Sequence, residues 1–214
     1  DGRVRHIVVV TCPIEGDARM TQGVFLNFLA ANQRVLECGP SLFEDEFVHR
    51  DEHSIEFQLP WMQTVHPGRA FRIVPVLCSA FEQYTGKKPP ESDPRVSGPL
   101  KALKALVAER KALVLASVDL SHVGPRFGDD VAVDDALAAD VQAADERLLA
   151  HAKAGDRGAF WTAGMSDGNA RRVDALSAVY ALLAVTDGKP GAVLAYGQGH
   201  DPAGGLVSFA AMSL

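Results

Sequence analysis

The sequence places an aspartate three residues before a histidine, directly after an apolar run. Residues 119–122 (DLSH) follow residues 112–118, which have the composition of a buried strand. A carboxylate near an imidazole fixes the tautomer of the ring and raises its basicity, which suits general acid–base catalysis and metal ligation. The alternative is that Asp119 and Ser121 only complete a turn. We favour a catalytic role for His122 and Asp119, with Ser121 in the same pocket.

Two other predicted strand ends carry acids or histidines beside glycines, which let a ligand approach the backbone. Glu15 follows the first apolar run, and His200 lies in a glycine-rich turn before the last one. His53 stands where a helix should start, within residues 51–56 (DEHSIE). Either His53 belongs to a pocket, or its neighbouring acids and Ser54 only cap that helix.

Predicted strands and helices alternate along the chain. Short β-branched runs, typical of strands covered on both faces, occupy residues 5–11, 71–78 and 112–118. Two further strands are predicted at residues 191–198 and 206–213. Helical patterns occupy residues 55–62, 100–110, 134–153 and 174–185, and the last should be buried because it is apolar nearly all round. This order predicts an α/β fold with a central, mostly parallel or mixed sheet flanked by helices on both faces. In such sheets, ligands bind beyond the carboxyl ends of the strands.

Length and composition indicate a single domain over residues 1–214 and exclude several classes of protein. The net charge of −6, with basic residues dispersed, argues against nucleic-acid binding. No apolar run approaches the ~20 residues that cross a bilayer, so no membrane partner is expected. The three cysteines form no C-x-x-C motif, which indicates free thiols and a cytoplasmic location. Nucleotide-binding, G-x-S-x-G and H-E-x-x-H motifs are also absent from the sequence.

Four strings of the sequence resemble the Memo-like protein family, which includes the AmmeMemoRadiSam system protein B group. Residues 51–60 (DEHSIEFQLP) are similar to its EHSIE-x-x-LP signature, and residues 117–122 (SVDLSH) to its S-S-D-[FL]-[SC]-H string. Residues 73–77 (IVPVL) and 207–211 (VSFAA) match a strand and the C-terminal ending of the family. The order and approximate spacing of these strings agree over most of the chain, which is therefore identified as a member of this family.

The resemblance implies a fold like that of the class III extradiol dioxygenases, with a non-haem metal pocket at one edge of the central sheet. In those dioxygenases two histidines and a glutamate hold iron, and another histidine acts as acid and base. Memo-like proteins with an intact pocket place histidines in a PHAGY-like, a GPSHH-like and an SSD-x-x-H string, and a cysteine near the C-terminus.

This sequence departs from that set. The PHAGY-like string is absent, because the chain begins at the strand that follows it, so the domain is expected to lack an N-terminal strand segment. Glu15 or Ile14 stands in the place of a GPSHH-like histidine, depending on the alignment. The region of the C-terminal cysteine reads QGHD, which includes His200 and Asp201. Only the position of His122 is retained.

Two functional hypotheses follow. The first is a divergent Memo-like protein with a degenerate metal pocket, which binds a small molecule or a protein partner and needs no cofactor. The second is a metal-dependent oxidoreductase or dioxygenase-like enzyme. In it, Glu15, His122 and His200, with Asp201 as a further candidate, would converge on a common cavity and hold iron or another divalent metal. We favour the first, because the loss of two expected histidines outweighs the one that is retained.

Overall fold

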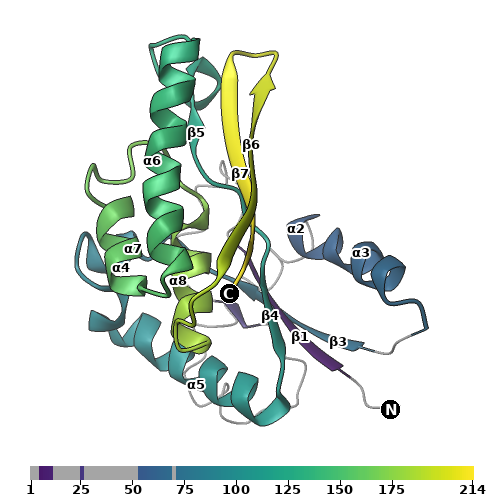
Figure 1. The fold of residues 1–214 in the computed structure, drawn as a ribbon. Coiled ribbons are helices and arrows are strands. Elements are labelled where there is room, and N and C mark those ends of the chain that lie inside the picture. Colours follow the sequence, from purple (N-terminus) through teal and green to yellow (C-terminus); the bar gives the residue numbers. More distant parts are fainter. Residues whose placement is uncertain (1–4, 12–24, 27–52, 69–70) are drawn as a thin grey trace. The chain divides into compact units, whose positions relative to one another are not determined.

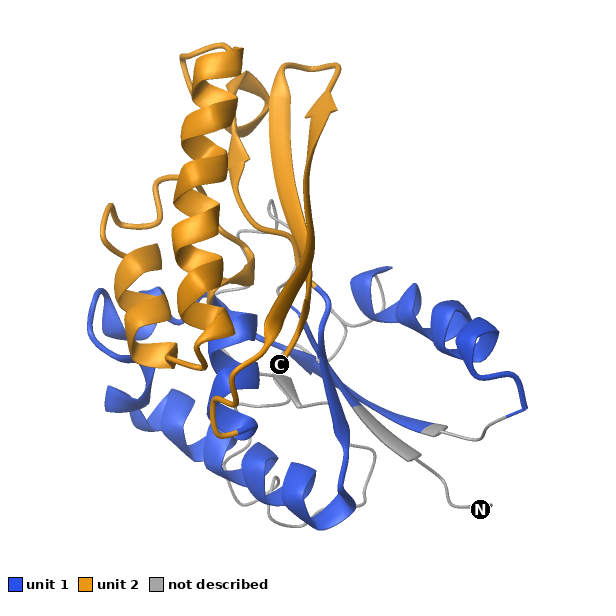
Figure 2. Ribbon diagram, viewed as in Figure 1, with its two compact units in different colours: residues 1–117, 177–186 blue, residues 118–176, 187–214 orange. Residues whose placement is uncertain are grey.

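The structure is a computed structural model, and it describes residues 5–11, 25–26, 53–68 and 71–214 (Figure 1). The chain divides into two compact units (Figure 2). Unit 1 comprises residues 1–117 and 177–186, and unit 2 comprises residues 118–176 and 187–214. Residues 119–122 therefore stand at the start of unit 2. The division does not test whether residues 1–214 form a single domain, which stays a prediction.

Unit 1 is built on a four-stranded sheet in which three strands are parallel. β1 (Arg5–Thr11) lies between β3 (Phe71–Leu77) and β4 (Leu113–Ala116) and runs parallel to both. The two-residue β2 (Phe25–Leu26) pairs antiparallel with β3. Val8, Val10 and Val76 of the paired strands are fully buried, as expected for a parallel sheet with both faces covered. The predicted strands at residues 5–11, 71–78 and 112–118 are thus confirmed as parts of one sheet.

The helices of unit 1 follow the predicted pattern, with short additional turns. Before β3 lie α2 (His53–Glu56) and α3 (Gln58–Val65), and after it lie α4 (Glu82–Thr85), the 3-10 turn η3 (Pro90–Ser92) and α5 (Pro94–Arg110). The Asp93 side chain caps α5 by accepting a hydrogen bond of 2.8 Å from the Arg95 N–H. The apolar side of α5 is buried, and its buried residues include Val96, Leu100, Leu103 and Leu106.

A late helix completes unit 1. In α8 (Ala175–Val185), the Ser177 hydroxyl accepts a 2.9 Å hydrogen bond from the N–H of Phe81, and the Tyr180 ring packs edge-on against the Phe81 ring. All three side chains are buried. The prediction of a buried helix at residues 174–185 is therefore confirmed, and its polar residue Ser177 has a backbone donor in the α4 turn.

Unit 2 packs a long helix against an antiparallel sheet. β7 (Gly205–Ser213) lies between β5 (His122–Val123) and β6 (Ala192–Asp201) and is antiparallel to both. The other elements of unit 2 are the 3-10 turn η4 (Pro125–Phe127), α6 (Asp135–Lys153) and α7 (Arg157–Gly164). Val141 of α6 packs against Val123 and Leu206 of the sheet. Within the described ranges, no helix is both long and apolar enough to cross a membrane.

The two C-terminal strands are confirmed, but they do not extend the parallel sheet. β6 and β7 pair with each other, and the turn between them spans only residues 202–204. A turn this short joins antiparallel neighbours, because a parallel pair needs a crossover of a dozen or more residues. The antiparallel sheet of unit 2 was therefore implied by the spacing of the two predicted strands, although their composition gave no sign of it.

Candidate functional site

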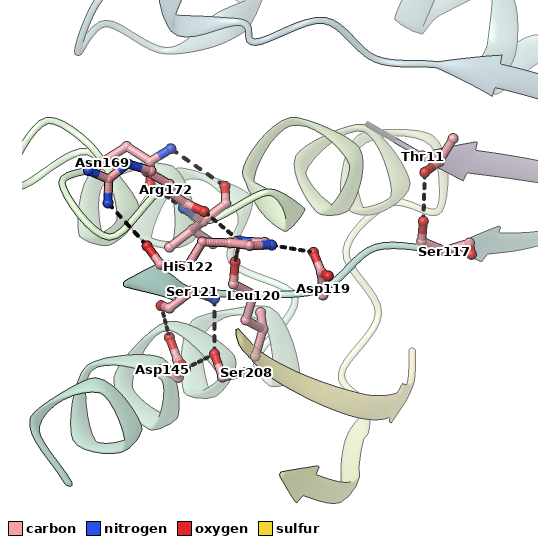
Figure 3. Close-up of polar contacts among 11 residues, drawn as sticks. Thr11, Ser117, Asp119, Leu120, Ser121, His122, Asp145, Asn169, Arg172 and Ser208 are labelled. Atoms are coloured by element: carbon pink, nitrogen blue, oxygen red, sulfur yellow. Dashed lines mark hydrogen bonds and ion pairs between the residues drawn. The ribbon is translucent and has the colours of Figure 1, made fainter. Parts of the chain in front are cut away.

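Both ring nitrogens of His122 face hydrogen-bond acceptors. Nδ1 lies 3.2 Å from the Leu120 carbonyl oxygen and 3.1 Å from that of Arg172, and Nε2 lies 3.5 Å from Oδ1 of Asp119 (Figure 3). The ring also packs edge-on against Phe127, with centroids 5.1 Å apart. Carbonyl and carboxylate oxygens only accept hydrogen bonds, so this environment suits a ring that is protonated on both nitrogens.

The electrostatics of the site favour the same protonated ring. Burial by itself lowers the pKa of His122. The Asp119 carboxylate, the Arg172 carbonyl and the charge of Asp174 outweigh burial and raise the pKa to about 9. At neutral pH, His122 is therefore an imidazolium beside a carboxylate. The His122 side chain is only 12% exposed, whereas the Asp119 side chain is 41% exposed, so the carboxylate is the accessible half of the pair.

A loop before α8 holds the backbone of the motif in place. The His122 N–H donates to the Arg171 carbonyl at 2.7 Å, and the Asp174 N–H donates to the Leu120 carbonyl at 3.1 Å. The Arg172 guanidinium donates to the His122 carbonyl at 3.2 Å and forms an ion pair of 2.7 Å with Asp129. The guanidinium and the Gly124 N–H hold the pKa of the Asp129 carboxyl below its usual range. The loop thus supplies a second layer of contacts around His122.

Ser121 points away from His122, into the contact between α6 and the sheet (Figure 3). Its hydroxyl donates to Oδ1 of Asp145 at 2.6 Å, and both side chains are fully buried. Ser208 and Tyr196 donate to Oδ2 of Asp145 at 2.5 and 2.9 Å. Burial raises the pKa of Tyr196 to about 12, with help from the Asp145 charge, so this hydroxyl keeps its proton. Ser121 therefore anchors the motif to α6, and its expected place beside His122 is not what the structure shows.

The structure does not bring His200 to His122. In the register of the sheet, His122 is opposite Val207, and Val207 is opposite Gly199, whereas His200 is opposite Leu206. Cross-strand partners share a face and successive residues alternate, so the two histidines lie on opposite faces. Their predicted partner Glu15 lies outside the described residues. Asp201 accepts a hydrogen bond from Ala203 in the hairpin turn. Within the described ranges, no three side chains of His, Cys, Asp or Glu are placed to hold one metal ion.

His53 begins α2 in unit 1 and is exposed, with its ring edge-on to Phe57 at 5.5 Å. The next residue, Ser54, holds α2 in place through hydrogen bonds to the ends of two strands. The Ser54 hydroxyl is 2.6 Å from that of Thr11, which itself donates to the Ser117 carbonyl at 2.7 Å. Ser117 in turn donates to the Ser54 carbonyl at 2.9 Å, and Gln58 donates to the Ser117 hydroxyl at 2.8 Å. These hydroxyls tie α2 to the carboxyl ends of β1 and β4.

Replacing Thr11 by valine should lower the free energy of unfolding by about 1–2 kcal/mol. Valine has nearly the same shape as threonine, but it can neither donate to the Ser117 carbonyl nor accept from Ser54. Urea titration of the two proteins measures the difference. The control is Thr64→Val, since Thr64 is exposed and its hydroxyl donates to the Pro60 carbonyl of its own helix. Equal stability of the two variants would show that the strand-end hydroxyls add nothing to the fold.

Sequence reasoning found the Asp119–His122 pair but missed Asp145 and Arg172. For Asp145 a signal existed, because it falls on the predicted apolar face of its helix, four residues after Val141. Acidic residues are almost never fully buried unless they have partners. For Arg172 the sequence gave no local signal of a role in the site. The residues that it contacts, Asp129 and His122, lie 43 and 50 residues earlier in the chain.

Comparisons with known proteins all point to one family. The model of the Memo-like protein family matches residues 29–213. A MEMO1 family protein of Thermus thermophilus is 30% identical over 155 residues, which is 72% of this chain and 42% of that protein. MEMO1 family proteins of Methanopyrus kandleri and Archaeoglobus fulgidus are 35% and 33% identical over 95 and 106 residues. These stretches are 44% and 46% of this chain, and 30% and 35% of those proteins. The matched stretch is thus less than half the length of each relative.

Proposed function

Because the chain belongs to the Memo-like protein family, we propose that it is a divergent member that binds a small hydroxyl-bearing molecule at His122 and Asp119. The observation that carries this proposal is the pair itself, in which Nε2 and Oδ1 are 3.5 Å apart. This separation is long for a direct charged hydrogen bond. A hydroxyl group both donates and accepts, so one that approaches the pair from the side can accept from Nε2–H and donate to the carboxylate.

An iron centre needs more ligands than the described residues supply. Nδ1 of His122 faces two carbonyl oxygens, which leaves Nε2, beside Asp119, as the nitrogen that could bind an ion. One histidine with one carboxylate binds iron weakly, and within the described ranges no three side chains of His, Cys, Asp or Glu are placed to hold one ion. The oxidoreductase alternative therefore depends on Glu15.

Catechol is a suitable probe, because it carries two adjacent hydroxyl groups on a small ring. We expect isothermal titration calorimetry to detect catechol binding to the wild-type protein. Its affinity should fall at least about tenfold in Asp119→Asn, the loss expected for one charge-assisted hydrogen bond. The matched ligand 1,2-dimethoxybenzene has the same ring without hydroxyl protons and should not bind. Equal binding of both ligands, or unchanged catechol affinity in Asp119→Asn, would contradict the proposal.

The metal content of the protein distinguishes the two hypotheses. After purification without added metal and dialysis, we expect iron, copper and zinc well below one ion per chain, because one histidine with one carboxylate binds these ions weakly. Glu15→Ala and His200→Ala should leave the content unchanged, and catechol should be bound without ring cleavage or oxygen uptake. Elemental analysis and an oxygen electrode make these measurements. Stoichiometric metal that disappears in either variant would favour the oxidoreductase alternative, with the substituted residue as one of the ligands.

A further inference from the structure

We propose that Arg172 is the positioning residue of this site: its guanidinium, anchored on Asp129, fixes the backbone carbonyl that orients the His122 ring. The consequence for ligand binding rests on the proposed function, whereas the effect on the ring does not. This role places His122 and does not require Arg172 itself to contact the ligand.

Arg172 holds His122 from two directions. Its carbonyl oxygen accepts from Nδ1 of the ring at 3.1 Å, and its guanidinium Nη1 donates to the His122 carbonyl at 3.2 Å. The first contact sets the rotation of the ring, and the second fixes the backbone from which the ring projects. Because both contacts come from one residue, a shift of Arg172 would move the acceptor and the backbone support together.

The guanidinium is itself anchored by a fork of hydrogen bonds to Asp129, of 2.7 Å from Nη2 and 3.3 Å from Nη1. Such paired contacts between arginine and a carboxylate fix orientation as well as position. Asp129 also accepts from the Gly124 N–H at 2.7 Å. Gly124 has a φ of 103°, and a Cβ there would lie 2.3 Å from the Gly204 carbonyl oxygen, so this turn accepts only glycine. The anchor of Arg172 is thus built into a tightly constrained turn.

The backbone of Arg172 is in the left-handed region, with a φ of 50°. Asn169, three residues earlier, has a φ of 59° and closes the turn by accepting from the Val173 N–H at 2.7 Å. Asparagine adopts this conformation readily, whereas for arginine it is unfavourable and persists only where surrounding contacts impose it. The contacts that hold it here include those to His122 and Asp129 and the hydrogen bond from the Arg172 N–H to the Asn169 carbonyl. This strain lets the positioning role be separated from a purely structural one.

The test uses Arg172→Gly, because glycine adopts the left-handed conformation without strain and keeps the carbonyl while it removes the guanidinium. Long-range ¹H–¹⁵N spectra at pH 7 report the His122 ring, which is assigned by its absence in His122→Gln. We expect the wild-type protein to show a slowly exchanging Nδ1–H signal and Arg172→Gly to lose it. The thermal midpoint should stay within about 4 °C of the wild type, since relief of strain offsets the lost ion pair.

Asp129→Asn provides a second route to the same result. It leaves Arg172 in place but weakens the anchor, so the Nδ1–H signal should again be lost, and the double variant should show no further change. If Arg172→Gly does not fold, Asp129→Asn alone tests whether the anchored Arg172 positions the His122 ring. The control is Arg171→Lys, since the Arg171 side chain forms its ion pair with Asp167. In the control the signal should be retained.

The outcomes separate the two proposals. A wild-type Nδ1–H signal in folded Asp129→Asn and Arg172→Gly would overturn the positioning role. If the signal is lost, catechol affinity should also fall at least about tenfold in Arg172→Gly. Loss of the signal in a protein whose wild type binds no catechol would retain the positioning role and reject the proposed function.

Discussion

Replacing Asp145 by alanine is expected to lower the free energy of unfolding by about 3–5 kcal/mol, the largest effect of any substitution considered for this protein. The Asp145 carboxylate is fully buried and accepts hydrogen bonds from Ser121, Ser208 and Tyr196. Alanine would leave these three hydroxyls without their acceptor and open a cavity between α6 and the sheet. A buried donor that loses its partner costs far more than an exposed one, because water cannot replace the bond.

Chemical denaturation of Asp145→Ala and Asp145→Asn would measure this effect. Asparagine keeps one oxygen that accepts hydrogen bonds, so Asp145→Asn should lower the free energy of unfolding less than Asp145→Ala. The amide nitrogen that replaces the other oxygen cannot accept the hydrogen bonds made to that oxygen. The control is Asp140→Ala, an exposed position on the same helix, which should change stability by no more than about 0.5 kcal/mol. A loss below about 1 kcal/mol in Asp145→Ala would show that α6 is held by its apolar contacts alone.

The second large effect is a dependence of stability on pH that His122 imposes. Its pKa is raised to about 9 in the folded protein, against 6.5 for an ordinary histidine. The folded state therefore binds the proton more tightly, and the resulting stabilisation is complete below pH 6.5 and is lost as the pH rises through about 9. After a discount for the solvent around the 41% exposed Asp119 side chain, it is on the order of 2 kcal/mol.

The measurement is the free energy of unfolding of the wild type minus that of His122→Gln, at several pH values between 6 and 10. The difference cancels the titration of groups that the two proteins share. It should be largest at pH 6 and should shrink toward pH 10, with Asp119→Asn giving a flatter curve than the wild type. A difference that stays constant over this range would mean that His122 is neutral in the folded protein.

The parts of the fold that could be predicted are those set by local patterns. The β-branched runs of β1 and β3 and the apolar length of α8 identify buried elements without knowledge of their partners. The Asp119–His122 pair was also predictable, because its members are only three positions apart in the chain. The partners of Arg172 and Asp145 were not predictable, because they lie 24 to 63 residues away in the chain and only the folded backbone brings them together. For Asp145 the sequence indicated burial alone, through its place on the apolar face of its helix.

His200 shows a different limit. Its residue type and its glycine-rich surroundings resemble those of a ligand site, but whether it can meet His122 depends on strand register. A one-residue shift of register reverses the face to which every side chain of a strand points. The sequence near His200 contains no signal of that register, because the register between β5 and β7 joins residues that are distant in the chain, with His122 opposite Val207.

The position of α8 in the chain has a consequence for synthesis on the ribosome. Unit 1 needs residues 177–186, yet residues 118–176 of unit 2 are translated before them. The hydrogen bond from Phe81 to Ser177 closes a loop of 96 residues, so it forms only after residue 177 has emerged. Nascent chains that end before α8 would expose Phe81 and the surrounding apolar side chains. Unit 1 therefore completes its folding only after α8 has left the ribosome, and chains that stall earlier expose apolar surface that favours aggregation.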